Sequence, residues 1–177
     1  SGCIEFVPLD QLHRENLDQT LIEFSLTNVS EAEIENLNLA WHRLDPWPDV
    51  VPGLQKLKSG YQIGTLSNGN IDLIKNMARH AGLPWDAILG AEVARAYKPQ
   101  PQAYLGSAAA IGFEPSQCML VAAHNNDLKA ALEVGFKTAF VARPFEHGSD
   151  QETDLFAEEE YDIVAQDFMD LAEQLGC

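Results

Sequence analysis

The sequence predicts an α/β fold, in which a doubly wound parallel sheet forms the core and a helical cap subdomain lies beside it. Short apolar runs alternate with helical stretches along most of the chain, and glycine closes several of those stretches. This alternation is typical of βαβ units, whose helices cover both faces of a parallel sheet. With 177 residues and 46% hydrophobic content, the chain can bury one sizeable core.

Residues 10–44 contain no strand pattern, and we interpret residues 1–46 as part of a cap. Apolar residues at helical spacing predict a first helix after residue 10, and Ser30 with Glu33 forms a capping box that opens a second helix. The sequence Asp45-Pro46-Trp47-Pro48 then interrupts the helical pattern. We therefore predict that residues 47–177 form the α/β core.

Five apolar runs in the core have the length of strands. They are Tyr61 to Leu66, Ala87 to Leu89, Met119 to Ala123, Thr138 to Val141 and Asp162 to Val164. The helices between them are expected to end at glycines that supply the left-handed C-cap conformation. These are Gly60, Gly82, Gly112 and Gly135.

The charge balance argues against nucleic acid and membrane partners. Lys and Arg total 11 against 27 Asp and Glu, a net charge of −16, whereas nucleic acids and anionic membranes attract basic surfaces. No stretch approaches the apolar length of a membrane-spanning helix. The cysteines, Cys3, Cys118 and Cys177, are far apart, so we interpret them as reduced thiols in a cytoplasmic protein.

Polar residues follow three of the predicted strands, at the edge where open parallel sheets bind ligands. Ser67 and Asn68 follow the first run, Lys98 lies in a proline-bounded loop after the second, and Asp127 follows the third. Each alone has an ordinary explanation as a turn, a surface charge or a carboxylate at a helix start. Together they favour a functional site at this edge, and we expect a small anionic substrate.

These segments resemble motifs of the haloacid dehalogenase superfamily. The matching stretches are Leu66-Ser67-Asn68-Gly69, Lys98-Pro99 and the segment from Val121 to Ala131. Within the superfamily the chain is most similar to the 2-haloacid dehalogenases. These carry Lys-Pro-x-Pro-x-x-Tyr, here Lys98 to Tyr104, and Leu-x-x-aromatic-Pro, here Leu44 to Pro48. The resemblance implies a Rossmann-like core with a cap over the site.

The resemblance also implies nucleophilic covalent catalysis without a cofactor or a metal. An aspartate would attack the carbon that bears the halogen, halide would leave, and activated water would hydrolyse the resulting ester. Ser67 and Asn68 would bind the substrate carboxylate, with Asn68 also near the departing halide. Lys98 would orient the nucleophile and offset its charge, and Asp127 would position or activate the water.

Two further residues are candidates for substrate contact by the same resemblance. Trp47 is the aromatic residue of the motif that precedes the core, and Tyr104 ends the lysine motif. For Tyr104, a purely structural role as a helix residue that packs on the core agrees equally well with the sequence.

The chain departs from the family pattern in two places. The nucleophile motif, an aspartate followed closely by Gly-Thr, does not occur in the chain, and neither does the cap arginine that follows it. Where dehalogenases have Ser-Ser-Asn, this chain has Ala122-Ala123-His124. His124 is either a catalytic donor or base that replaces the asparagine, or only a polar loop residue.

Two other functions agree with parts of the sequence. A magnesium-dependent phosphatase of the same superfamily would carry a carboxylate four residues before Asp127, but Ala123 stands there, so we expect no magnesium beside Asp127. A truncated or non-catalytic binding module would explain the missing nucleophile but not the retained Lys98 and Asp127. Apolar surface on the cap helices could also support a homodimer.

The family topology predicts a gap in the sheet, because the nucleophile strand lies between the strands that end at Ser67 and near Ala123. We expect the backbones near Thr65 and Val121 to be about 10 Å apart, rather than paired at about 5 Å. Unpaired buried backbone groups cost about 1–3 kcal/mol each. We therefore expect residues before Ser1, or a borrowed strand, to fill the gap, and residues 1–177 alone to be insoluble or molten.

Overall fold

The computed structural model describes residues 6–177, in which helices outnumber strands. The helices are α1 (Leu9–Glu23), α2 (Glu31–Asn38), α3 (Val50–Leu57), α4 (Ile71–Ala81), α5 (Pro101–Ala110), α6 (Asn125–Glu133) and α7 (Phe168–Gln174). The strands are β1 (Met119–Ala122), β2 (Lys137–Val141) and β3 (Ile163–Ala165). Short 3-10 helices are η1 (Leu39–Arg43), η2 (Ala91–Val93) and η3 (Pro115–Gln117).

The three strands form one parallel sheet in the order β1-β2-β3. Met119 pairs with Lys137 at the start of β1, and Ala139 pairs with Ile163 at the start of β3. The predicted strands in these regions are confirmed, each boundary lying within one residue of its expected position. Because the strands are parallel, their carboxyl ends and the loops that follow them share one edge of the sheet.

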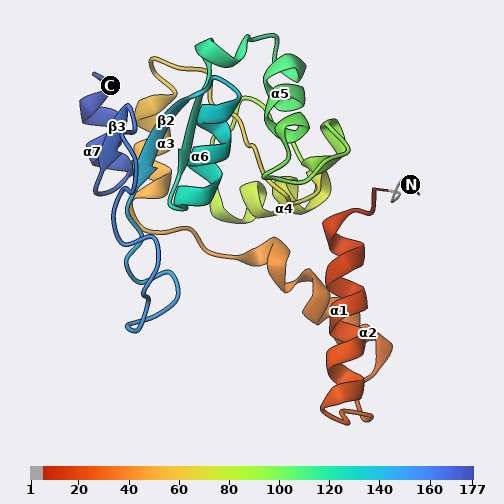
Figure 1. Ribbon diagram of the computed structural model, residues 1–177. Coiled ribbons are helices and arrows are strands. Elements are labelled where there is room, and N and C mark those ends of the chain that lie inside the picture. Colours follow the sequence, from red (N-terminus) through yellow and green to blue (C-terminus); the bar gives the residue numbers. More distant parts are fainter. Residues whose placement is uncertain (1–5) are drawn as a thin grey trace.

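Helices cover both faces of the sheet, as the α/β prediction requires (Figure 1). Side chains of β2 alternate between the faces: Phe140 belongs to one apolar cluster, and Ala139 and Val141 belong to the other. The first cluster is completed by α5 and α6 through residues such as Tyr104 and Leu128. The second includes apolar residues of α3 and α7.

The prediction of full strands at Tyr61 to Leu66 and at Ala87 to Leu89 is wrong. These runs meet in a single parallel bridge between Gly64 and Ala87. On either side of it, side chains replace the backbone partners that a longer ladder would need. The Asp86 carboxylate accepts from Ile63 N at 3.0 Å, and Thr65 Oγ1 both accepts from Leu89 N and donates to Leu89 O at 2.8 Å.

The glycine C-caps are confirmed at three of the four predicted positions. Gly82, Gly112 and Gly135 have positive φ angles of 67°, 79° and 88° just after α4, α5 and α6. The prediction for Gly60 is wrong. Helix α3 ends at Leu57, and the chain continues through right-handed turns in which Gly60 N donates to Leu57 O.

Strand β1 has a backbone partner on one side only within residues 6–177. It pairs with β2, whereas Thr65 N donates to Ala87 O and so turns away from β1. The expectation that Thr65 and Val121 do not pair directly is therefore confirmed for the described residues. The expected separation of about 10 Å and the identity of any strand between them stay predictions.

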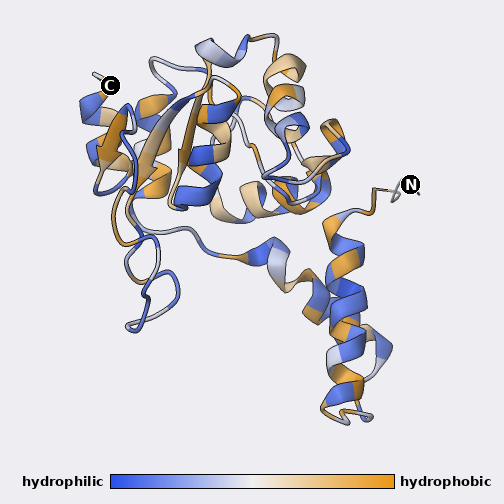
Figure 2. Cartoon of the chain, in the orientation of Figure 1, coloured by the Kyte–Doolittle hydropathy of each residue, from blue (hydrophilic) through white to orange (hydrophobic). Residues whose placement is uncertain are grey.

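Helices α1 and α2 extend from the α/β body as an arm (Figure 1). Both predicted helices are present, and the capping box at Ser30 is confirmed, with Ser30 N donating to Glu33 Oε2 at 2.9 Å. Neither helix contains a buried residue, and the arm mixes hydrophilic and hydrophobic residues along its length (Figure 2). Its large exposed apolar side chains include Ile22, Phe24, Leu26, Leu37, Leu39 and Trp41.

A polar network joins the arm to the start of α4. Asp10 Oδ2 accepts from Asn70 Nδ2 at 2.7 Å, and Asp10 N donates to Asn70 Oδ1 at 3.1 Å. The buried His42 lies between Asp10 and Asn76, at 2.9 Å and 3.0 Å. Because Asn70 comes directly after the segment Ser67–Gly69, the arm is attached next to a predicted binding loop. No described helix combines the length and apolar content needed to cross a membrane.

A partly buried ion pair fixes the start of the core. Arg143, just after β2, donates to Asp49 Oδ2 at 2.6 Å, and Phe168 N donates to the same oxygen at 2.9 Å. Burial works to raise the pKa of Asp49, but the hydrogen bonds from Arg143 and Phe168 outweigh it and hold that pKa below its ordinary value. This carboxylate therefore ties α3, β2 and α7 together in its charged form.

We predict that Asp49→Asn lowers the free energy of unfolding by about 1–3 kcal/mol at neutral pH. Because the folded pKa of Asp49 lies below its unfolded value, this stabilisation is complete above the unfolded pKa. It is lost as the pH falls through the folded pKa, so the gap between wild type and variant should close in acid. Urea unfolding at several pH values measures it. Asp45→Asn, an exposed carboxylate of the same segment, is the control, and an equal loss there would contradict the assignment.

Candidate active site

An ion pair between Lys98 and Asp127 lies at the carboxyl edge of the sheet. Lys98 Nζ donates to Asp127 Oδ2, and the two side chains are only 20% and 14% exposed. The prediction that Lys98 lies within salt-bridge reach of Asp127 is confirmed. A pair this shielded from water interacts more strongly than a surface pair, and removal of either partner leaves a charge without compensation.

Tyr104 completes the contacts of this carboxylate. Its side chain is fully buried, its hydroxyl donates to Asp127 Oδ1 at 2.6 Å, and its ring packs edge-on against Phe136. Burial first, and then the adjacent Asp127 carboxylate, raise the pKa of Tyr104, so the phenol keeps its proton at neutral pH and acts as a donor. Tyr104 is therefore a core residue whose hydroxyl also contacts the Asp127 carboxylate of the site.

The local sequence explains how these three side chains meet. Pro101 begins α5, where proline needs no N–H partner, and Tyr104 follows one turn later on the buried side of the helix. Asp127 lies in the first turn of α6, directly after β1, where the helix dipole favours a carboxylate. Asp127 therefore receives two hydrogen bonds from side chains and a favourable helix end.

Asn68 joins the first binding loop to the lysine loop. Lys98 N donates to Asn68 Oδ1 at 2.7 Å, and Asn68 Nδ2 donates to Lys98 O at 3.3 Å. Ser67 lies next to it, and its hydroxyl accepts from Gly69 N at 3.0 Å. The structure thus brings the predicted residues Asn68, Lys98, Tyr104 and Asp127 into one connected cluster, with Ser67 at its border.

His124 and Trp47 make their contacts elsewhere. His124 Nε2 lies 3.0 Å from Glu146 Oε2, and its ring stacks against that of His147. Trp47 lies beneath the guanidinium of Arg143, whose carbon is 5.5 Å from the ring centroid.

Three residues of this edge were missed by sequence reasoning: Arg143, Glu146 and His147. All follow β2, and the rule that ligands bind beyond strand ends applied equally to the predicted strand that ends at Val141. Arg143 could therefore have been identified from the sequence by the same rule. The proximity of Glu146 and His147 to His124 depends on the lateral pairing of β1 with β2, which has no signal in a single sequence.

The polar neighbours of Asp127 bear on metal binding. Both of its oxygens accept from donors, the Lys98 ammonium and the Tyr104 hydroxyl. A magnesium ion requires several oxygen ligands and would have to displace a cation from this carboxylate. The donor set does not fit magnesium, and the expectation that none binds beside Asp127 stays a prediction.

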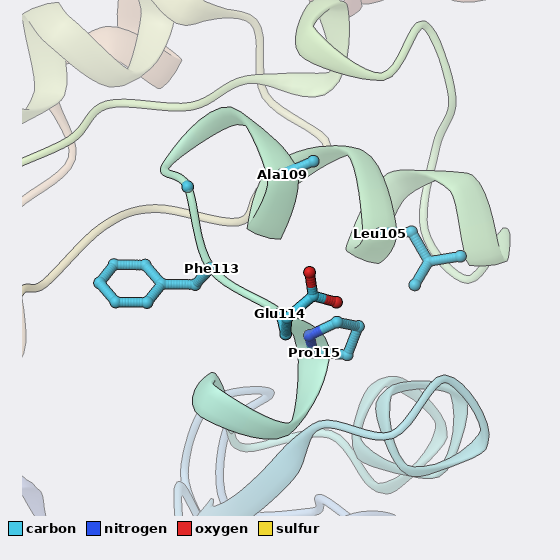
Figure 3. A pocket seen from close by; sticks show the side chains of 6 residues that line it. Leu105, Ala109, Phe113, Glu114 and Pro115 are labelled. Carbon is cyan, nitrogen blue, oxygen red and sulfur yellow. The ribbon is translucent and has the colours of Figure 1, made fainter.

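An open pocket of about 480 Å³ lies at the opposite end of α5 (Figure 3). It is lined by Leu105, Ala109, Gly112, Phe113, Glu114 and Pro115. These residues lie at the carboxyl end of α5 and before β1, whereas Lys98 precedes α5 and Asp127 follows β1. The pocket therefore belongs to the amino edge of the sheet, where open α/β sheets do not place their active sites.

Comparison with known proteins identifies the family. A family model described as haloacid dehalogenase-like hydrolase matches residues 3–135, three quarters of the chain. This chain belongs to the haloacid dehalogenase-like hydrolases. The family resemblance drawn from the Ser67, Lys98 and Asp127 motifs is confirmed.

Relatives and solved structures agree with the family assignment. The chain is 31% identical over 132 residues to an (S)-2-haloacid dehalogenase of Xanthobacter autotrophicus, covering 73% of this chain and 51% of that protein. It is 32% identical to (S)-2-haloacid dehalogenase 4A of Burkholderia cepacia, covering 62% and 48%. The chain thus spans about half the length of the curated relatives it matches. The crystal structure of a defluorinating L-2-haloacid dehalogenase superposes with a TM-score of 0.96 at 52% identity, covering 99% of this chain and 73% of that one.

We predict that Gly90→Ala displaces the loop that carries Ser67 and Asn68. An added Cβ would lie 2.6 Å from Ile71 N and 2.8 Å from Gly69 O, closer than packed atoms allow. The loop must shift, at a cost of about 1–3 kcal/mol in the free energy of unfolding. Thermal unfolding and amide chemical shifts around Gly69 measure the effect. The control is Gly60→Ala, whose nearest neighbour is the Cys177 sulfur at 3.1 Å; unchanged Gly69 signals in Gly90→Ala would contradict this prediction.

Proposed function

We propose that the protein removes halide hydrolytically from a small 2-haloalkanoic acid through an aspartyl-ester intermediate. The observation that carries the proposal is the cluster in which Lys98 and Tyr104 both donate to Asp127. It supplies a largely shielded cation and a largely shielded carboxylate at the edge of the sheet where reaction chemistry is expected. The named dehalogenase relatives, which share this fold, support the choice of reaction.

The proposed reaction has two steps. An aspartate that is not among these 177 residues attacks the carbon bearing the halogen, so that a C–O bond forms while the C–X bond breaks and halide leaves with its electron pair. Water then adds to the ester carbonyl, the acyl C–O bond breaks, and a 2-hydroxy acid and the free carboxylate are released. The water loses one proton overall to solvent.

Each member of the cluster has a proposed role in these steps. Lys98 orients the attacking carboxylate and offsets its charge, because its ammonium is a cation already shielded from bulk water. Asp127 positions or activates the hydrolytic water. Tyr104, whose hydroxyl remains protonated, holds the Asp127 side chain in place and restricts its rotation.

The substrate carboxylate is proposed to bind at Ser67 and Asn68. Both side chains are partly exposed at the border of the cluster, and their present hydrogen bonds are to neighbouring backbone groups. With a net charge of −16, local donors of this kind are needed to hold an anion. We further propose that Trp47 contacts the substrate, and that His124, when released from Glu146, orients water.

The test uses the full-length protein, which would supply the nucleophilic aspartate. Halide release from each enantiomer of 2-chloropropionate is measured beside phosphate release from p-nitrophenyl phosphate, with and without magnesium chloride, and halide release from at least one enantiomer is expected. Halide release that is insensitive to chelator supports the proposal. Magnesium-dependent phosphate release without halide release would support the phosphatase alternative instead. The absence of both activities in the folded full-length protein would favour a non-catalytic binding module.

In the full-length enzyme, Lys98→Ala should lower kcat for halide release by about 100-fold or more, because the nucleophile and ester intermediate lose a nearby cation. The fold should be retained, as judged by a cooperative thermal transition. Lys129→Ala is a matched control, since Lys129 lies on α6 and is paired with Glu158 at 2.8 Å on the surface. A loss of kcat that is equal in both variants would argue against a role for Lys98 in the reaction.

Three features of organisation are part of the same proposal. Residues 1–46 form part of a cap over a core of residues 47–177, because α1 and α2 contain no buried residue and meet the core through the Asp10 network. The exposed apolar side chains of this arm support a homodimer, which analytical ultracentrifugation would test.

The protein is cytoplasmic with free thiols at Cys118 and Cys177, and cell fractionation would test this; Cys3 lies outside the described residues.

A further inference from the structure

Two loops beyond the sheet bring together three side chains that have no part in the Lys98 cluster. His124 follows β1, and Glu146 and His147 follow β2. One ligand atom from each residue lies within 4.8 Å of the other two. The rings of the two histidines are nearly parallel, with centroids 6.5 Å apart.

We propose that His124, Glu146 and His147 form a binding site for a transition-metal ion of the Zn²⁺ type. Two imidazole nitrogens and one carboxylate oxygen are the donors of many three-ligand zinc sites, which keep a fourth position open. Magnesium and calcium prefer oxygen ligands, so two imidazoles select against them. This site differs from any magnesium site at Asp127, because none of its ligands is shared with the Lys98 cluster.

Metal binding requires only a small adjustment of the distances between the three ligand atoms. Zinc–nitrogen and zinc–oxygen bonds of about 2.0–2.2 Å in a tetrahedral site place the ligand atoms about 3.4 Å apart. His124 Nε2 and Glu146 Oε2 are already 3.0 Å apart. The remaining movement falls on His147, whose side chain lies in an exposed turn and is free to rotate about its Cβ.

The surroundings favour a cation. The net charge of −16 raises the local concentration of divalent ions near the surface, and side-chain exposures of 48% for His124 and 31% for Glu146 leave a path from solvent. The positive end of α6 opposes this weakly, because His124 is its N-cap. That penalty is small beside three coordinate bonds. The alternative is that His124 and Glu146 form only a hydrogen bond. That alternative does not explain why the His147 side chain lies beside them.

A bound metal would affect the neighbouring site through His124, and this consequence rests on the proposed function. Coordination engages the ring nitrogen that now faces Glu146. That nitrogen then can neither donate to nor accept from a water held by Asp127, three residues further along the chain, and the ring is held beside Glu146 and His147. Zinc should therefore inhibit hydrolysis of the ester reversibly, and chelator should restore it.

Isothermal titration of the chelator-treated protein with zinc sulfate tests the site directly. One equivalent of Zn²⁺ should bind, and magnesium chloride should give no heat. Glu146→Gln and His147→Asn should each weaken Zn²⁺ binding by about tenfold or more. The matched control is His80→Asn, because His80 is another exposed histidine paired with a carboxylate, Asp45 at 2.9 Å, but with no third ligand among residues 6–177.

Zinc binding that is absent, or that is equally strong in His147→Asn, would overturn the site and would place any bound ion at other groups such as the thiols. Halide release separates this result from the proposed function. Zinc inhibition in wild type but not in His147→Asn supports the consequence, and unchanged activity with zinc bound overturns the inhibition alone. If the protein released no halide at all, the proposed function would fail, while the titration would still decide the metal site.

Discussion

The shielded pair of Lys98 and Asp127 is the interaction on which the arrangement of the site depends. Removal of two charges from water costs several kcal/mol for each ion, and the attraction between them compensates only when the remaining polar atoms are satisfied. Here the second carboxylate oxygen accepts from Tyr104, and the backbone of Lys98 is held by Asn68. The contacts made by Tyr104 and Asn68 therefore serve one requirement. Each of them restricts the motion of a group on which the ion pair between Lys98 and Asp127 depends.

The sequence predicted the α/β class and the three paired strands because their signal is local. Short apolar runs give the approximate boundaries of β1, β2 and β3 without any knowledge of their partners. The same signal failed at Tyr61 to Leu66, where Asp86 and Thr65 side chains take the hydrogen bonds of a ladder. An apolar run specifies burial, but pairing also depends on which groups compete for the backbone.

In the candidate site, too, local sequence signals could be predicted, whereas contacts between distant segments could not. Ser67, Asn68, Lys98 and Asp127 could be predicted because each lies in the segment that follows an apolar run, and strand ends gather at one edge of a parallel sheet. The hydroxyl bond of Tyr104 could not be inferred, since it depends on the packing of α5 against α6. The same holds for His124, whose neighbours Glu146 and His147 come from a loop about twenty residues away that only strand order brings close.

Charge at this edge of the sheet places a constraint on any anionic ligand. Two of the 11 basic residues, Lys98 and Arg143, are largely shielded from water, and each is paired with a carboxylate, Asp127 or Asp49. These pairs leave no net positive charge in a molecule whose total is −16. An anion that binds here must therefore use neutral donors such as the Asn68 amide, or compete with Asp127 for the Lys98 ammonium. An anion that displaced Asp127 from the Lys98 ammonium would leave the Asp127 carboxylate free to contact water. Binding of the anion and exposure of this carboxylate as a base would then be coupled.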